Sequence, residues 1–128
     1  MAQITLNTLK KHRADNTKFS MVTAYDACFA NLASKAGIDS ILVGDSLGMV
    51  LQGHQSTLPV TVADIAYHTQ CVAAASPHCL IVADIPFMAS VTTQDAVDTA
   101  RELMRAGAHV LKVEGGSNLV HLIRLYRD

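Results

Sequence analysis

Apolar runs and amphipathic segments alternate along the chain, and this alternation predicts strands followed by helices. The four apolar runs that predict strands are residues 19–25, 41–45, 79–84 and 109–114. Apolar residues recur at helical spacing after each run, and a short segment at 8–13 predicts a leading helix. Four strand-then-helix units in this order predict a parallel sheet with right-handed crossovers.

Polar residues mark where the predicted helices begin. Asp26 follows the first strand as an N-cap, and the Thr-x-x-Asp patterns at 61–64 and 92–95 resemble capping boxes. Gly37 predicts the end of the first of these helices, and residues 46–59 predict a long loop. The apolar stripes that we expect to be buried are Phe29, Leu32, Ala33 and Ala36; Val62, Ile65, Ala66, Thr69 and Val72; Ala96, Ala100, Leu103 and Gly107; and Leu119, Leu122, Ile123 and Tyr126.

Three of the predicted strands end in a carboxylate, namely Asp45, Asp84 and Glu114. A carboxylate at the end of an apolar strand is costly to bury unless a cation compensates it, and a divalent metal is the candidate cation. The residues that alternation places on matching faces are Ile41, Val43 and Asp45; Leu80, Val82 and Asp84; and Val110, Lys112 and Glu114. If the sheet curls into a barrel with these faces inward, the carboxylates and Lys112 meet at its C-terminal mouth.

The residue types at this mouth suggest a chemistry but leave alternatives open. Oxygen ligands suit a hard ion such as Mg²⁺, whereas zinc normally recruits histidine or cysteine. Lys112 either neutralises a substrate carboxylate or forms a salt bridge with Glu114 or a neighbouring carboxylate. An aspartate after a strand also often forms a turn or caps a helix. We expect Tyr25 to pack in the core and His54 to lie on the surface of the loop.

Composition narrows the classes of function. The 128 residues, half of them hydrophobic, fit a single domain over 1–128 with an ample core. A net charge of −1 does not indicate binding to nucleic acid or to an anionic membrane. No apolar stretch reaches the roughly 18 to 20 residues of a membrane span, and no targeting segment is recognised, so we expect a cytoplasmic protein. The three cysteines lack CxxC spacing, which favours free thiols over zinc or disulfides.

Five segments of the sequence closely resemble ketopantoate hydroxymethyltransferase. They are residues 43–49 (VGDSLGM), 52–54 (QGH), 56–61 (STLPVT), 83–88 (ADIPFM) and 112–116 (KVEGG). The resemblance implies a (β/α)₈ TIM barrel of the phosphoenolpyruvate/pyruvate type. It also implies an enzyme of pantothenate biosynthesis, which transfers a hydroxymethyl group from 5,10-methylenetetrahydrofolate to 3-methyl-2-oxobutanoate.

The same resemblance implies roles for individual residues. Asp45 and Asp84 would contact Mg²⁺ directly and line the substrate site, and Glu114 would act on the metal through water. Ser46 and Lys112 would hold the substrate carboxylate. Enzymes of this family take their general base, a glutamate, from the second half of the barrel. We therefore expect the base to lie beyond Asp128, and we expect no catalytic base within residues 1–128.

Four predicted strands make half of an eight-stranded barrel. An isolated half would leave its first and fourth strands as open edges and expose inward residues such as Val43 and Val82 to water. We therefore expect this chain alone to aggregate, to dimerise into a makeshift barrel as a homo-oligomer, or to be part of a longer protein. Two alternative functions stay open: a catalytically silent half-barrel that binds a partner chain, and a Mg²⁺-dependent carbon–carbon lyase acting on a 2-oxo acid.

Overall fold

The computed structural model describes residues 2–76 and 78–127, in which strands alternate with helices. The elements are α1 (Leu6–Ala14), β1 (Met21–Thr23), α2 (Ala27–Lys35), β2 (Ser40–Val43), α3 (Leu47–Val50), α4 (Val62–Ala75), β3 (Leu80–Asp84), α5 (Thr93–Arg105), β4 (Val110–Lys112), the 3₁₀ helix η1 (Ser117–Leu119) and α6 (Val120–Arg127). The order agrees with the four predicted strand-then-helix units. It differs in one place, because the predicted loop over 46–59 contains the short helix α3.

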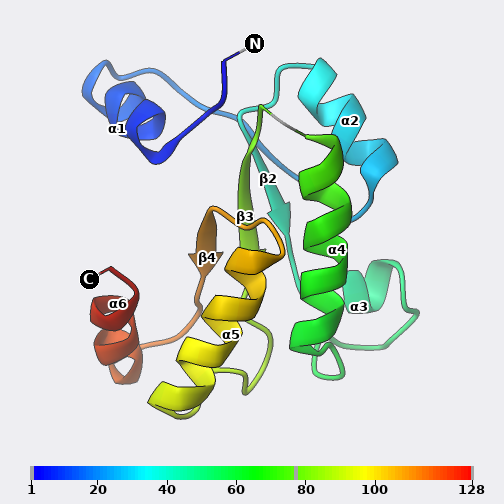
Figure 1. The fold of residues 1–128 in the computed structure, drawn as a ribbon, viewed down its shortest axis with the longest axis vertical. Coiled ribbons are helices and arrows are strands. Elements are labelled where there is room, and N and C mark those ends of the chain that lie inside the picture. Colours follow the sequence, from blue (N-terminus) through cyan, green and yellow to red (C-terminus); the bar gives the residue numbers. More distant parts are fainter. Residues whose placement is uncertain (1, 77, 128) are drawn as a thin grey trace.

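The four strands lie side by side in sequence order, and every neighbouring pair is parallel. Figure 1 shows α4 and α5 packed along the sheet, with α2 beside one end of α4. Strands joined through helices on one face are the arrangement that the repeated units predict. Within the described residues the sheet is open, and β1 and β4 form its two edges.

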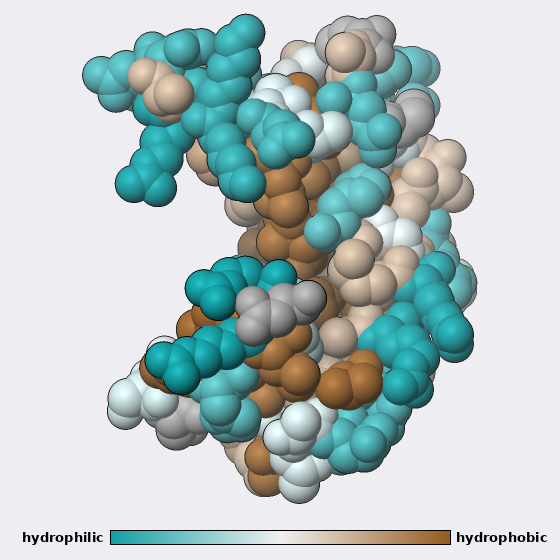
Figure 2. Space-filling model, turned by 60° about the vertical axis from the view of Figure 1, so that its left-hand side comes forward, coloured by the Kyte–Doolittle hydropathy of each residue, from teal (hydrophilic) through white to brown (hydrophobic). Residues whose placement is uncertain are grey.

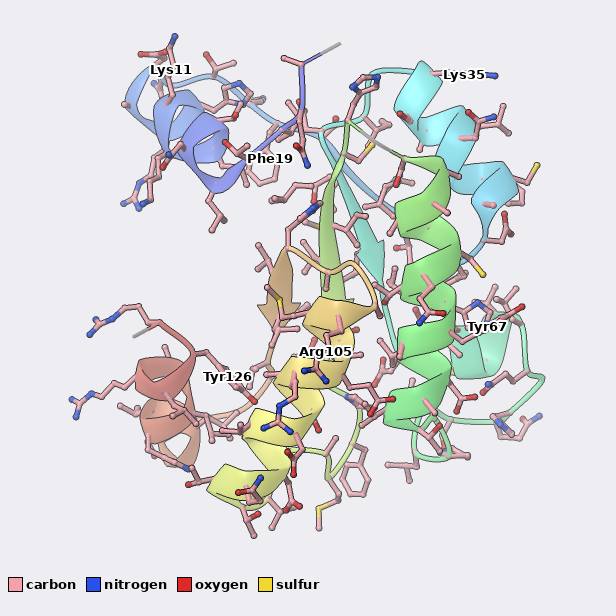
Figure 3. All side chains as sticks on the ribbon, viewed as in Figure 1. Lys11, Phe19, Lys35, Tyr67, Arg105 and Tyr126 are labelled. Atoms are coloured by element: carbon pink, nitrogen blue, oxygen red, sulfur yellow. The ribbon has the colours of Figure 1, made fainter. Side chains whose placement is uncertain are left out.

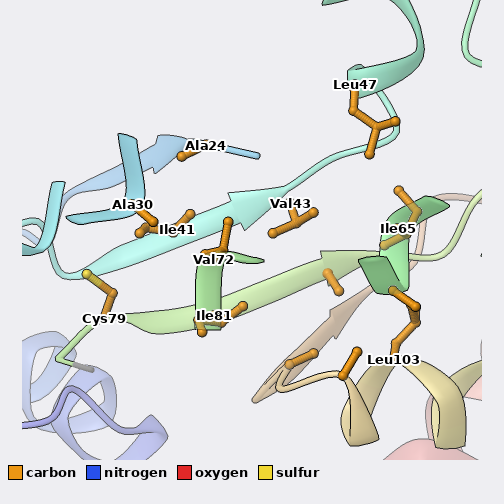
Figure 4. Close-up of a cluster of buried hydrophobic side chains, with 14 of the residues drawn as sticks. Ala24, Ala30, Ile41, Val43, Leu47, Ile65, Val72, Cys79, Ile81 and Leu103 are labelled. Atoms are coloured by element: carbon orange, nitrogen blue, oxygen red, sulfur yellow. The ribbon is translucent and has the colours of Figure 1, made fainter. Parts of the chain in front are cut away.

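The hydrophobic core lies between the sheet and these helices. Ile41 and Val43 of β2 pair in register with Ile81 and Ala83 of β3, and all four side chains are buried. Figure 4 shows Ile41 and Ile81 close to Val72, which α4 contributes to the same cluster. The odd-numbered residues of both strands therefore face the helices.

This register corrects the predicted inner face. Leu42 pairs with Val82 and Asp84 pairs with Lys112, so these residues lie on the face away from the core helices. Val43 lies on the covered face and is buried, so the prediction that the odd-numbered residues of β2 share the inner face with Asp84 is wrong. Alternation groups residues by face but does not say which face the helices cover. Val82 is buried too, because Leu42 and the β4 strand flank it on either side.

The helix caps confirm the predicted starts and stops. The Asp26 carboxylate accepts a hydrogen bond from the Phe29 backbone N–H at 2.8 Å. Both Thr-x-x-Asp patterns form complete capping boxes at the starts of α4 and α5. Gly37 ends α2 at a φ of +79°, a conformation that favours glycine. These helix ends can be predicted from the sequence, because each capping hydrogen bond joins residues only three or four positions apart.

The edges of the sheet leave apolar side chains exposed. All three residues of β1 are exposed, and Phe29 of α2 is 64% exposed. The buried residues of α2 are Ala30 and Ser34, so the predicted stripe through Phe29 and Leu32 is wrong. That stripe turns toward the outer side of β1, where no other described strand pairs with it.

A second apolar surface lies beside β4. An apolar groove of about 490 Å³ is bordered by Leu6 of α1, Met104 of α5, Leu111 of β4 and Ile123 of α6. Figure 2 shows a hollow with a hydrophobic floor on this side of the molecule. The predicted stripe of the last helix is correct for Leu122, which is buried, but not for Ile123, which is exposed. Tyr126 reaches from α6 toward α5 (Figure 3), and its hydroxyl donates to the Ala96 carbonyl at 3.0 Å.

Among the described residues, no helix combines the length and the apolar character that crossing a membrane requires.

Candidate functional site

The C-terminal ends of β3 and β4 bring a buried carboxylate and an amine together. Asp84 ends β3 and Lys112 ends β4, and the two residues are partners in the sheet register. Asp84 is 4% exposed, and its Oδ1 accepts a hydrogen bond from the Lys112 ammonium in an ion pair. Its other oxygen, Oδ2, accepts from the Asp45 backbone N–H at 3.1 Å. The loop after β2 is thereby tied to the end of β3.

Glu114 lies beyond the end of β4 rather than within the predicted strand. Its carboxylate is 2.7 Å from the Lys112 Nζ, and its side chain is 78% exposed. Lys112 therefore bridges a buried carboxylate and an exposed one, which agrees with the salt-bridge interpretation of this residue. An ion pair to an exposed carboxylate contributes little stability, because water screens it.

The protonation equilibria of these groups reflect their burial. Burial raises the pKa of Asp84 above its ordinary value, and the hydrogen bond and charge of Lys112 oppose this rise without cancelling it. Burial also acts to lower the pKa of Lys112, but the two carboxylates outweigh it, so the Lys112 pKa is raised. The hydrogen bond from Lys112 lowers the pKa of Glu114. Lys112 is thus held in its charged form.

These residues border a cavity of about 330 Å³ at the C-terminal edge of the sheet. The lining consists of Asp45, Thr57, Asp84, Ile85, Pro86, Phe87, Met88, Ser90, Lys112, Val113 and Glu114. Carboxylates, one ammonium and apolar side chains therefore face one space large enough for a small organic acid. Of the predicted site residues, Asp45, Asp84, Lys112 and Glu114 line this cavity.

Ser46 follows the lining residue Asp45 in the loop after β2, but it is not among the residues that border the cavity. A Cβ added to Gly44 would lie 3.1 Å from both the Ser46 Oγ and the Asp84 Oδ2, so both side chains lie close to the Gly44 backbone. Tyr25 is half-buried and packs against the core, as expected from the sequence. Its hydroxyl is also 2.7 Å from the Ser46 Oγ, a contact that was not predicted from the sequence. The position of Tyr25 at the end of an apolar run is the signal that could have pointed to it.

The general base has no counterpart among the described residues that border the cavity, and the roles predicted for the other site residues stay predictions as well. The family resemblance implies a base beyond Asp128, and Asp128 itself lies outside the described residues. The prediction that the base comes from further along the chain therefore stays a prediction.

The carboxylates at this edge of the sheet meet part of what a divalent ion needs. Among the residues that the structure describes, no three histidine, cysteine or carboxylate side chains are gathered as a closed metal cluster. Asp45 and Asp84 nevertheless line one cavity, and the raised pKa of Asp84 marks a carboxylate that extra positive charge would stabilise. Two carboxylates fit Mg²⁺, which usually takes one or two of them and keeps several waters.

Solved structures with similar folds define a class. A 2,3-dimethylmalate lyase, described as a PEP mutase/isocitrate lyase superfamily member, matches with a TM-score of 0.67 and 18% identity, over 88% of this chain and 41% of its own. A phosphoenolpyruvate phosphomutase from Streptomyces platensis subsp. rosaceus matches with a TM-score of 0.64 and 21% identity, over 80% of this chain and 36% of its own. The chain therefore shares with these proteins the fold of part of a TIM barrel.

Sequence comparisons define the family within this class. A family model described as ketopantoate hydroxymethyltransferase matches residues 3–127. A 3-methyl-2-oxobutanoate hydroxymethyltransferase from Psychrobacter arcticus is 57% identical over 94% of this chain and 46% of its own length. One from Edwardsiella ictaluri is 54% identical over the whole chain and 48% of its own length. The chain belongs to the ketopantoate hydroxymethyltransferase family and spans about half the length of these relatives.

Proposed function

We propose that the chain forms the substrate-binding part of an enzyme that transfers a hydroxymethyl group from 5,10-methylenetetrahydrofolate to 3-methyl-2-oxobutanoate, giving ketopantoate. The observation that carries the proposal is the cavity into which Asp45, Asp84 and Lys112 converge at the C-terminal strand ends. This edge is where barrels of this kind hold their active sites. Membership of the family favours this transfer over a carbon–carbon lyase reaction.

The proposed substrate is a small acid whose carboxylate lies beside a keto oxygen. Lys112 supplies the positive charge that attracts the carboxylate, and the Ser46 hydroxyl supplies a hydrogen-bond donor. The buried Asp84 keeps Lys112 charged and holds its ammonium at the cavity. Apolar residues of the lining, such as Phe87 and Met88, offer contacts for the branched alkyl group of the substrate.

Mg²⁺ is the metal that we propose for this site, with Asp45 and Asp84 as direct ligands. Glu114 would act through water, which suits an exposed carboxylate at the rim of the cavity. When bound, the ion would polarise the keto group and make the adjacent C–H bond more acidic.

The reaction needs further groups that we do not assign to this chain. Removal of the C–H proton requires a general base, and the carboxylates of the cavity are already committed to Lys112 or to the proposed metal. We therefore propose that the base and the contacts to the folate co-substrate are contributed from outside residues 1–128, the base by a segment beyond Asp128.

Calorimetric titration with 3-methyl-2-oxobutanoate tests the proposed site. We expect the chain to bind the acid in MgCl₂ and to lose this binding in EDTA. Replacing Asp45 with alanine should weaken the Mg²⁺-dependent binding by at least about tenfold, whereas Asp98→Ala, a change at an exposed carboxylate on α5, should leave it unaltered. Equal binding in EDTA contradicts the metal, and an absence of binding in both buffers contradicts the substrate site.

A turnover assay tests the assignment of the base. We expect the purified chain to form no ketopantoate above background when supplied with both substrates and Mg²⁺. Turnover by the chain alone contradicts the proposal that the base is contributed from outside it.

The open edges of the sheet support a second proposal, which is that the chain assembles with another chain, either a copy of itself or a complementary partner. Both edge strands are unpaired on one side within the described residues, and apolar side chains are exposed beside them, at Met21 and Phe29 beside β1 and in the groove beside β4. Unpaired edges of this kind favour association. A stable monomer at low concentration in sedimentation velocity contradicts this proposal.

A further inference from the structure

Tyr25 contacts two other elements of the fold, the loop after β2 and helix α4. It follows β1, and its hydroxyl is 2.7 Å from the Ser46 Oγ in the loop after β2. Its backbone carbonyl lies 2.8 Å from the Nδ1 of His68, a half-buried residue of α4. The residue is therefore held at its backbone by a helix while its phenol points to the serine. The Tyr25 ring also packs against the hydrophobic core, so the residue combines a packing contact with a hydrogen bond to the serine.

The Ser46 hydroxyl has no structural task within its own segment. Ser46 precedes α3, yet its backbone is helical and its side chain makes no cap hydrogen bond. The Oγ instead lies beside Gly44, where a Cβ on that glycine would be 3.1 Å from it and 3.1 Å from the Asp84 Oδ2. Of the hydrogen bonds described for the Ser46 side chain, the one to Tyr25 is therefore the one that orients it.

The Tyr25 and Ser46 hydroxyls can form a chain of hydrogen bonds that ends on a third group. A serine hydroxyl has one proton to donate and two lone pairs that accept. When Tyr25 donates to the Ser46 Oγ, the serine proton is left to donate to a third group. Ser46 follows Asp45, which borders the cavity together with Lys112, so an anionic oxygen bound beside the Lys112 ammonium is a partner that suits this proton. A chain of two such hydrogen bonds also strengthens each member.

We propose that Tyr25 is a positioning residue, which aims the Ser46 hydroxyl at the carboxylate of a 2-oxo acid in the cavity. This inference rests on the proposed function for the identity of the ligand. It adds a residue that acts through Ser46 and does not touch the substrate. The proposal also assigns a role to the contact between α4 and the end of β1, because the hydrogen bond from His68 holds the backbone of the residue that carries the phenol.

A double-mutant cycle tests the inference. In MgCl₂, Tyr25→Phe should weaken the binding of 3-methyl-2-oxobutanoate by about fivefold and Ser46→Ala by about tenfold. The double variant should bind no more weakly than Ser46→Ala, because the phenol acts through the serine. Tyr67→Phe is the matched control, since this α4 tyrosine is 63% exposed and should bind like the wild type (Figure 3). Wild-type binding by Tyr25→Phe, or multiplying losses in the double variant, overturns the inference.

A second measurement does not depend on the ligand. The Hα–Hβ couplings of Ser46, measured by NMR on the free protein, should report one side-chain rotamer in the wild type and an average in Tyr25→Phe. Unchanged couplings in the variant overturn the positioning role. If the wild type binds no 2-oxo acid, the proposed function fails, and the couplings still decide whether Tyr25 orients Ser46.

Discussion

The two ends of the same sheet use an aspartate in opposite ways. At the N-terminal end, the Asp39 Oδ2 accepts hydrogen bonds from the Ser20 backbone N–H at 2.7 Å and from the Ser20 hydroxyl at 2.9 Å. The Asp39 N–H donates in return to the Ser20 Oγ at 3.1 Å. At the C-terminal end, Asp84 is more deeply buried and pairs with the Lys112 ammonium at a cavity.

The difference distinguishes a carboxylate with a structural role, Asp39, from one that is placed to bind a ligand, Asp84. Asp39 is satisfied by groups of its own neighbourhood and joins the start of β2 to the residue before β1. The pKa of Asp84 is raised, because the effect of burial outweighs the opposite effect of the hydrogen bond and charge of Lys112. A group whose charge is costly in the folded protein is one that a ligand can stabilise further. The comparison therefore predicts that variants at the first end change stability alone, whereas variants at the second end also change ligand binding.

The largest effect is expected at Asp84. Replacing it with asparagine removes the buried charge that holds Lys112 and, in the proposed site, a metal ligand. The Mg²⁺-dependent affinity for 3-methyl-2-oxobutanoate should fall by at least about 100-fold in calorimetry. Asp98→Asn serves as the control, because that carboxylate is exposed on α5. Unchanged affinity in Asp84→Asn removes this residue from the site.

A change at Asp39 should show the reverse pattern. Asp39→Ala leaves the Ser20 N–H and hydroxyl without their acceptor, so the free energy of unfolding should fall by about 2 kcal/mol. Urea denaturation measures this loss, and the remaining folded protein should bind the 2-oxo acid as the wild type does. Weaker binding by the folded variant contradicts the division between the two ends of the sheet.

Replacement of Lys112 tests how charge and burial are balanced. Lys112→Met should lower the free energy of unfolding by about 1.5 kcal/mol near neutral pH. This is below the 3 to 5 kcal/mol or so of a fully buried pair, because the lysine side chain is 36% exposed. Lys10→Met, an exposed change on α1, should alter stability by less than about 0.5 kcal/mol.

The pH dependence of this variant has a defined sign. The folded-state pKa of Asp84 is raised, so its contribution lowers stability as the pH rises from about 3.9 through the folded pKa. Without the ammonium this pKa rises further, and the deficit of Lys112→Met should grow over that window. The pKa of Lys112 is raised as well, so the wild type loses its advantage as the pH climbs through that folded value, above 10.5. A deficit that is independent of pH in urea titrations contradicts this account.

The smallest effects are expected from a pair of glycines. A Cβ on Gly44 would crowd the Asp84 Oδ2 and the Ser46 Oγ at 3.1 Å, so Gly44→Ala should weaken ligand binding by about threefold with little change in stability. Gly37 has a φ of +79°, so Gly37→Ala should cost about 1 kcal/mol of stability and leave binding unaltered. Calorimetry and urea denaturation on both variants check the pair, and an exchange of the two outcomes contradicts the comparison.

Much of the fold followed from local patterns. The caps at Asp26, Thr61 and Thr92 and the stop at Gly37 were predicted correctly, because their hydrogen bonds join residues close in sequence. The strand-then-helix order followed from hydrophobic spacing. The exposure of Phe29 did not follow, because it depends on what packs outside β1 rather than on the pattern within α2.

The candidate site was predicted in part. The carboxylates after apolar strands and the lysine of β4 indicated a charged strand edge, and Asp45, Asp84 and Lys112 line one cavity there. The link from Tyr25 to Ser46 was missed, because it joins residues 21 positions apart through the geometry of two neighbouring loops. The number of residues between two such side chains depends on the helix and loops that join their strands. It therefore does not predict whether the two side chains are in contact.

The sequence by itself determined the elements, their order, the parallel sheet and the family, since these depend on local hydrogen bonding, hydrophobic period and motif identity. The tertiary structure decided which face of β2 is covered, which apolar residues stay exposed and which carboxylate keeps a raised pKa. Those properties depend on burial, and burial is set by strands and helices that are distant in the chain. Asp39 and Asp84 have the same side chain. Their surroundings differ, so Asp39 joins two neighbouring strands by hydrogen bonds, whereas Asp84 is a candidate ligand-binding residue.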